Sequence, residues 1–134
     1  MSFVSRWPVL KTYAVTVNDL DPGGLIRDDV MARWIDEAVS AYLSLCTSLP
    51  PAAARRLRRL PAREELGRPE RVAVSAGAKE IRRGSFTVGI RLRPIHGGDP
   101  KVFDTACEIE LPTGVTEAIR DQLIALEHAA HHVN

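Results

Sequence analysis

The sequence NDLDPGGLIRDDVMARWIDEA, from Asn18 to Ala38, combines a turn signal with the start of a helix. From Asp28 onward, apolar residues recur at helical spacing on one face: Met31, Trp34, Ile35, Ala38, Tyr42 and Leu45, with Val30, Val39 and Leu43 widening the stripe. Asp28 or Asp29 suits the N-cap, and the proline pair in CTSLPP cannot continue a helix. We therefore predict a core helix over Asp29–Cys46 that is apolar on all sides.

Strand patterns flank this helix in the sequence. TYAVTV, Thr12–Val17, is rich in β-branched and aromatic residues and predicts a strand before the helix. After the helix, three segments alternate apolar and polar residues: RVAVSAGAKEIRR (71–83), SFTVGIRLRP (85–94) and KVFDTACEIEL (101–111). The turn sequences RRGS and HGGDP between them predict consecutive antiparallel hairpins. A last helix is predicted over Val115–Ala130, with Ile119, Leu123 and Leu126 on one face.

The segment AAARRLRRLPAREELGRPER (52–71) has a weaker pattern. We predict a short basic helix there, followed by a short strand or lid around Leu60–Leu66. The whole order is thus a strand, a buried helix and an antiparallel meander, and a sheet with one apolar face must wrap the apolar helix. The sequence predicts an α+β fold in which an antiparallel sheet curls around one long central helix, in a single domain spanning residues 1–134.

The composition argues against several function classes. The 18 Lys+Arg residues nearly balance the 17 Asp+Glu residues, so no strong field marks a nucleic-acid or membrane-surface binder. No apolar run approaches membrane-spanning length, and Arg6 and Pro8 interrupt the start of the chain, where a signal sequence would be apolar. Cys46 and Cys107 each lie in an apolar pattern, which favours two unpaired, buried thiols. We expect a cytoplasmic protein that binds neither nucleic acid nor a membrane.

Three motifs, in this order of elements, resemble a known family. The run NDLDPGGLIRDDVMARWIDEAVSAYL resembles the segment after the first strand in hotdog-fold acyl-CoA thioesterases of the 4-hydroxybenzoyl-CoA thioesterase type. The family patterns Asp-x-Asp-Pro-x-Gly and Arg-Trp-x-Asp-x-Ala are matched by Asp19, Asp21, Pro22 and Gly24, then by Arg33, Trp34, Asp36 and Ala38. KEIRRGSF (79–86) resembles the family's hairpin before its fourth strand, and HGGD (96–99) falls where the family makes its next turn. The resemblance implies a hotdog fold.

The resemblance also implies an activity, hydrolysis of an acyl-CoA thioester without a cofactor or a metal. Asp21 matches the family's catalytic aspartate, which is a nucleophile or a general base. An ionised carboxylate can attack a thioester carbonyl, or deprotonate the water that does. Because Asp21 precedes a proline, we expect an extended conformation that projects the carboxylate away from the helix. The alternative is that Asp21 only stabilises a turn, since Asp-Pro-Gly is an ordinary turn sequence.

Other residues are assigned to substrate binding. Gly24 permits a tight turn and close approach of an acyl group. Asp28 stands where the closest relatives of the family have a tyrosine, and Leu25, Ile26 and Arg27 stand where some subgroups have His-Val-Asn. Arg82 and Arg83 match positions at which the family contacts the phosphates of coenzyme A, and guanidinium groups suit phosphate oxygens. The alternative for this arginine pair is a solvated hairpin.

Two further carboxylates and two histidine motifs are interpreted as structural. Asp19 is assigned to a turn or an interface, and Asp36 to a structural role with an arginine partner. HGG (96–98) is interpreted as a hairpin turn, and HAAHH (128–132) as solvated histidines rather than a metal site.

The resemblance further implies a homodimer or a dimer of dimers with active sites between the subunits. Edge strands of a short sheet also need to be covered. Two other functions stay open: a hotdog protein that binds an acyl thioester or a protein partner without turnover, and a hydratase or dehydratase. The last would need a histidine near the aspartates, whereas the first histidine after them is His96.

Overall fold

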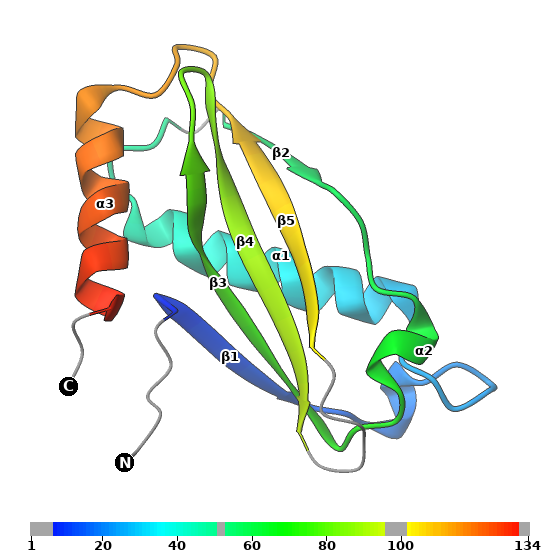
Figure 1. The fold of residues 1–134 in the computed structure, drawn as a ribbon. Helices are drawn as coiled ribbons and strands as arrows, with labels where there is room; N and C mark the ends of the chain where they lie inside the picture. The colour runs from blue at the N-terminus through cyan, green and yellow to red at the C-terminus, as the bar shows by residue number, and fades with distance from the viewer. Residues whose placement is uncertain (1–6, 51–52, 96–101, 132–134) are drawn as a thin grey trace.

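The computed structural model describes residues 7–50, 53–95 and 102–131 of the chain (Figure 1). Its elements, in chain order, are β1 Val9–Ala14, the 3-10 helix η1 Val17–Asp19, α1 Asp28–Leu45, β2 Ala54–Leu57, α2 Arg63–Leu66, β3 Arg71–Ile81, β4 Ser85–Ile95, β5 Phe103–Glu110 and α3 Glu117–His131. Each helix and strand predicted with a clear period is present, with ends that differ by a few residues.

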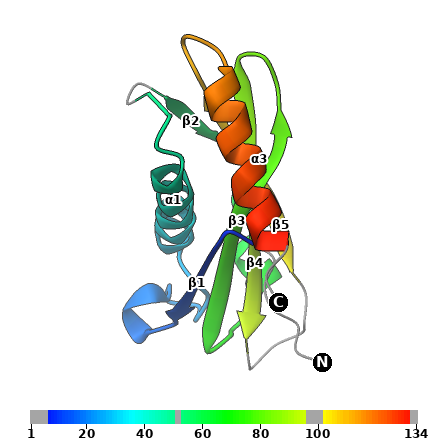
Figure 2. The same ribbon diagram turned by 90° about the vertical axis from the view of Figure 1, so that its left-hand side faces the viewer.

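The strands form one five-stranded antiparallel sheet in the order β1-β3-β4-β5-β2. β3, β4 and β5 are neighbours in both sequence and space, and β1 and β2 add to the two edges. The sheet curls along one side of α1, as the two perpendicular views show (Figures 1 and 2). This is the predicted α+β arrangement of a sheet wrapped around a long central helix.

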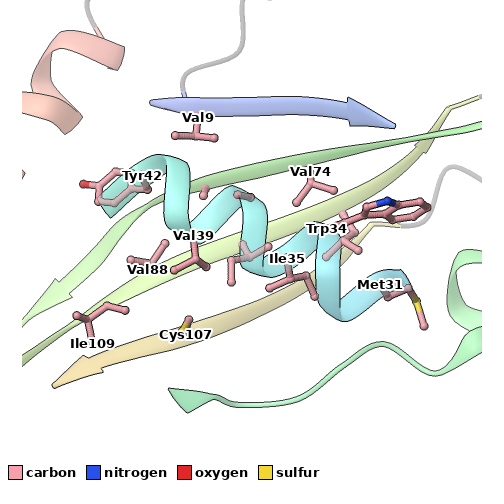
Figure 3. Close-up of a cluster of buried hydrophobic side chains, with 14 of the residues drawn as sticks. Val9, Met31, Trp34, Ile35, Val39, Tyr42, Val74, Val88, Cys107 and Ile109 are labelled. Carbon is pink, nitrogen blue, oxygen red and sulfur yellow. The ribbon is translucent and has the colours of Figure 1, made fainter. Parts of the chain in front are cut away.

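The hydrophobic core lies between α1 and the concave face of the sheet (Figure 3). From α1 it takes Val30, Met31, Trp34, Ile35, Ala38, Val39 and Tyr42. From β3, β4 and β5 it takes alternate residues, among them Val72, Val74, Phe86, Val88, Ile90, Leu92, Cys107 and Ile109. Burial of each large apolar side chain stabilises the fold by about 1.5–3 kcal/mol. The apolar residues that recur every 3.6 positions in the helix and every second position in the strands therefore pack together in one core.

Helix α3 packs against one end of this core, and the half-buried carboxylate of Glu127 holds it there. Glu127 Oε2 accepts hydrogen bonds from the Tyr42 hydroxyl at 2.9 Å and from the Ala78 N–H at 3.1 Å. Gly77 makes room for this carboxylate, because a Cβ there would lie 3.1 Å from Glu127 Oε1. Ile119 and Leu123 of α3 are buried and Leu126 is partly buried, so the apolar face predicted for this helix packs against the core.

Two predictions about α1 are wrong in detail. Its N-cap is Arg27, whose backbone is extended, while Asp28 and Asp29 lie in the first turn. The helix starts there because the preceding residues run as a hairpin as far as Arg27. The helix is also not apolar on all sides: Arg33 is exposed, and Leu45, predicted to lie on the buried face, is 42% exposed at its last turn.

The prediction for the segment 52–71 has the wrong order. A strand, β2, comes first, and the short helix α2 follows it. β2 pairs with β5, where Arg55 faces Ile109 and Leu57 faces Cys107. The unpaired edge of β5 offers backbone hydrogen bonds that outweigh the helix propensity of a short arginine-rich sequence.

Both cysteines are buried and unpaired, as predicted. Burial raises the pKa of each thiol above its ordinary value. Cys46 Sγ contacts Gln122 Oε1 of α3 at 3.2 Å, so the thiol helps to join the end of α1 to α3. Within the described ranges, no helix is long and apolar enough to cross a membrane.

Candidate active site

Residues 19–27 form a small β-hairpin directly before α1, with Asp21 at its tip. Leu20 and Ile26 pair across this hairpin as an antiparallel bridge. The Gly24 N–H donates to the Asp21 carbonyl at 3.0 Å, and Gly24 has a φ of +83°, a left-handed conformation that favours glycine. This is the geometry of a three-residue hairpin loop that ends in a left-handed residue. The sequence Asp-Pro-Gly-Gly therefore places one carboxylate at a turn just before the N-terminus of α1.

The Asp21 carboxylate is half-buried and turns back on its own hairpin. Its Oδ1 accepts a hydrogen bond from the Leu25 N–H at 3.0 Å, and the Asp21 N–H donates to the Leu25 carbonyl at 2.7 Å. Asp21 lies outside α1, in the hairpin before it, and its carboxylate does not project freely from the chain. The turn-stabilising role is thus present in the structure, and it fixes where the carboxylate points.

Arg68, from the connection between α2 and β3, covers the tip of this hairpin. Its Nη2 donates to the Gly23 carbonyl at 3.0 Å. Its guanidinium packs beside Gly24, where an added Cβ would lie 3.6 Å from Cζ and Nε. Arg68 thus occupies space beside Gly24, and the close approach of an acyl group to this glycine stays a prediction. Since 45 residues separate Arg68 from Gly23, no local sequence signal could have identified this contact.

The N-terminus of α1 follows the hairpin at once, and it has no side-chain cap. The first amides of an uncapped helix carry partial positive charge and can polarise a carbonyl oxygen. Asp28 lies there, exposed, at the rim of a shallow pocket of about 540 Å³ that is lined by Asp28, Arg59, Leu60, Pro61, Ala62 and Glu64. Asp28, predicted to bind substrate, is thus at a surface hollow on the same end of the molecule as Asp21.

Arg82 and Arg83 lie at the turn between β3 and β4 and are both exposed. Backbone contacts fix this turn, because the Val115 N–H donates to the Arg83 carbonyl at 2.7 Å and the Arg82 N–H to the Ser85 carbonyl at 2.8 Å. An open groove of about 700 Å³ beside it is lined by Ile81, Arg82, Arg83, Val115, Thr116, Glu117, Arg120 and Asp121. Arg120 is a third guanidinium at this groove that the sequence analysis missed.

The structure does not bring the two groups of predicted site residues together within one chain. The Asp21 hairpin lies beside α2, and the β3–β4 turn lies at the opposite end of the sheet in both views (Figures 1 and 2). Asp21, Gly24 and Asp28 thus form one cluster, and Arg82 and Arg83 another.

The two remaining carboxylates have structural contacts. Asp19 Oδ2 accepts hydrogen bonds from the backbone and side chain of Thr16 at 2.9 and 3.0 Å, which is the predicted turn role. Asp36 lies on the exposed side of α1 and pairs with Arg55 of β2 at 3.0 Å. The prediction of an arginine partner for Asp36 is therefore confirmed.

The two histidine motifs fall mostly outside the described residues. Residues 96–101, which include HGG, are not described, and of HAAHH only the exposed side chain of His128 is. Among the described residues, no group of three or more His, Cys, Asp or Glu side chains could hold a metal ion.

Comparison with solved structures places this geometry in a known fold. A thioesterase from Thermus thermophilus, complexed with coenzyme A and Zn, matches 93% of this chain and 98% of its own, with a TM-score of 0.64 and 17% sequence identity. A member of the thioesterase superfamily from Jannaschia sp. CCS1 matches 91% of this chain and 84% of its own, with a TM-score of 0.65 and 15% identity. The chain has the hotdog fold.

A 4-hydroxybenzoyl CoA thioesterase mutant, complexed with 4-hydroxybenzoyl CoA, is also similar in structure. It matches 86% of this chain and 97% of its own, with a TM-score of 0.58 and 18% identity. No protein-family model and no curated protein sequence matches the chain. The chain thus shares the hotdog fold with these proteins at a sequence identity that is too low to transfer the role of any single residue.

Proposed function

We propose that the chain is an acyl-CoA thioesterase, with Asp21 as its nucleophile or general base. The observation that carries this proposal is the half-buried Asp21 carboxylate, held at the hairpin tip directly before the central helix of a hotdog fold. The names of similar structures, a thioesterase complexed with coenzyme A and a 4-hydroxybenzoyl CoA thioesterase, favour an acyl- or aroyl-CoA as the substrate.

The chemistry follows from this placement. Asp21 attacks the thioester carbon and forms an anhydride that water then hydrolyses, or it takes a proton from the water that attacks. In either route the carbon–sulfur bond breaks, coenzyme A leaves as its thiol, and the acyl group leaves as a carboxylic acid. Negative charge develops on the carbonyl oxygen, and the first amides of α1, directly after the hairpin, are backbone donors suited to stabilise it.

The proposed nucleotide contact, at Arg82 and Arg83, requires a second subunit. These arginines lie at the other end of the sheet from Asp21, so one acyl-CoA is expected to reach both groups only across an interface between two chains (Figure 1). A twofold dimer would create two such sites, and two dimers could associate further. The exposed side of α1, with Arg33 and the Asp36–Arg55 pair, is available for such an interface.

A second candidate is a hotdog protein that binds an acyl thioester without turnover. The contact that favours it is the hydrogen bond from the Leu25 N–H to Asp21 Oδ1, because an oxygen that stabilises a turn is less available for attack. We assign either activity to the cytoplasm, in line with two buried, unpaired thiols.

A thiol-release assay separates the two candidates. Wild-type protein is incubated with aromatic, short-chain and long-chain acyl-CoAs, and coenzyme A release is followed beside Asp21→Asn. Release by wild type that the variant loses supports the thioesterase. No release from any substrate, together with saturable binding of coenzyme A, supports the binding protein.

The shared site has its own test. Sedimentation at micromolar concentration should show a species above the 14.7 kDa mass of one chain. At acyl-CoA concentrations well below KM, mixed dimers of Asp21→Asn and Arg82→Ala/Arg83→Ala subunits should recover activity, because one of their two sites combines only unmutated groups. A monomer, or a mixture as weak as its parents, rules the shared site out.

A further inference from the structure

Arg68, which lies 45 residues further along the chain than Gly23, contacts the turn that carries Asp21. Two contacts define this clamp: the hydrogen bond from Nη2 to the Gly23 carbonyl at 3.0 Å, and the packing of the guanidinium beside Gly24. The carboxylate lies on the other side of this glycine, since a Cβ added at Gly23 would lie 3.3 Å from Asp21 Oδ1. Asp21 and Arg68 therefore flank the same glycine, Asp21 near the position that a Cβ would take and Arg68 at the carbonyl.

The arginine side chain suits this arrangement better than a lysine would. A guanidinium is planar and has five N–H donors in a fixed fork, so it can donate to a carbonyl while its plane packs on a backbone. A lysine ammonium could donate to the Gly23 carbonyl, but it has no plane to cover Gly24. The glycine pair Gly23–Gly24 has little conformational preference of its own, so an external contact decides how firmly the tip is held.

We propose that Arg68 is a positioning residue for Asp21, holding the hairpin tip in the conformation that aims the carboxylate at the thioester. This inference rests on the proposed thioesterase function and adds a residue that neither the sequence motifs nor the resemblance identifies. Arg68 acts through Gly23 and Gly24, so its loss is expected to lower kcat more than it raises KM. A shift of about 1 Å in a catalytic group can cost about a hundredfold in rate.

The test compares Arg68→Ala and Arg68→Lys with a matched control, Arg71→Ala. Arg71 is also an exposed arginine, only three positions further along, at the start of β3. We expect Arg68→Ala to lose about 10- to 100-fold in kcat with KM within about twofold, Arg68→Lys to recover only part of that, and Arg71→Ala to match wild type. Added guanidinium ion should restore part of the rate of Arg68→Ala and none of the rate of Asp21→Asn.

Hydrogen exchange gives a second measurement that needs no activity. The Gly24 and Leu25 amides are hydrogen-bonded within the tip, to the Asp21 carbonyl and to Asp21 Oδ1. In Arg68→Ala these two amides should exchange at least several-fold faster, while amides of β4 keep their rates. If Arg68→Ala does not fold, Arg68→Lys carries both measurements.

The outcomes separate this inference from the proposed function. If Asp21→Asn is inactive and Arg68→Ala is as active as Arg71→Ala, the positioning role is wrong and the thioesterase stands. If no acyl-CoA is hydrolysed by wild type, the proposed function fails, and with it the catalytic part of this inference. In that case faster exchange at Gly24 and Leu25 still supports Arg68 as the clamp of the tip, and unchanged exchange overturns it.

Discussion

Removal of the Glu127 carboxylate is expected to destabilise the protein by about 2–4 kcal/mol. Glu127 Oε2 accepts from the Tyr42 hydroxyl at 2.9 Å and from the Ala78 N–H at 3.1 Å. Tyr42 is fully buried, so Glu127→Ala leaves its hydroxyl and a main-chain amide without their acceptor. Each buried donor that loses its partner costs about 1–3 kcal/mol, and water at the half-buried Glu127 offsets part of the total.

Urea unfolding at one fixed protein concentration measures this loss. The control is Asp121→Ala, an exposed carboxylate of the same helix, which should change the free energy of unfolding by less than about 0.5 kcal/mol. Tyr42→Phe should cost about 1–2 kcal/mol, and the double variant should cost less than the sum of the two, because both remove the same hydrogen bond. An additive double variant, or Glu127→Ala as stable as the control, would refute the account of how α3 is held.

Three further outcomes can be checked. Gly24→Ala should lower the free energy of unfolding by about 1–2 kcal/mol, because the φ of Gly24 is +83°. Gly67→Ala should cost about the same, because Gly67 has a φ of +66° and open space around it, and a neutral Gly24→Ala is the contrary result. Burial, and after it the Glu127 carboxylate, raises the pKa of Tyr42 in the folded protein. The contribution of Tyr42 to the free energy of unfolding is therefore complete below about pH 10, the pKa of an unfolded tyrosine, and declines above it. Between about pH 9 and 11, the free energy of unfolding should fall less steeply with pH in Tyr42→Phe than in wild type, and equal slopes would contradict this. Arg82→Ala/Arg83→Ala should raise KM for acyl-CoA in a salt-dependent manner with little change in kcat, whereas an unchanged KM would move the nucleotide site elsewhere.

The parts of the fold that the sequence predicted are those in which one physical signal dominates. The apolar stripe from Val30 to Tyr42 has a helical period over several turns, and it became the buried face of α1. The alternation from Phe86 to Leu92 became the inward face of β4. In both, burial and backbone periodicity act in the same direction, so the local pattern was sufficient.

The parts that the sequence did not predict depend on contacts distant in the chain. β2 is a strand because the edge of β5 accepts it as a neighbour, and nothing in residues 52–71 records that edge. The N-cap of α1 is Arg27 because the hairpin before it is extended up to that residue. Local propensity cannot anticipate either effect, since each is imposed by a partner outside the segment.

The candidate site shows the same division. The Asp-Pro-Gly-Gly sequence predicted a turn with a carboxylate before the helix, and that turn is present. The pattern did not reveal that Asp21 Oδ1 accepts the Leu25 N–H, or that Arg68 occupies the space beside Gly24. Both depend on side-chain conformations that are set only after the chain has folded.

The most direct test of the central claim is the rate of thioester hydrolysis by Asp21→Asn relative to wild type. Asparagine keeps the size of the side chain and an Oδ1 that can accept the Leu25 N–H, so the hairpin should persist and only the charge is lost. Asp19→Asn is the matched control, because Asp19 lies on the same hairpin and contacts Thr16. We predict that kcat/KM falls by about two orders of magnitude or more in Asp21→Asn and by less than about fivefold in Asp19→Asn. Equal rates for Asp21→Asn and wild type would contradict the assignment of Asp21 as the catalytic group.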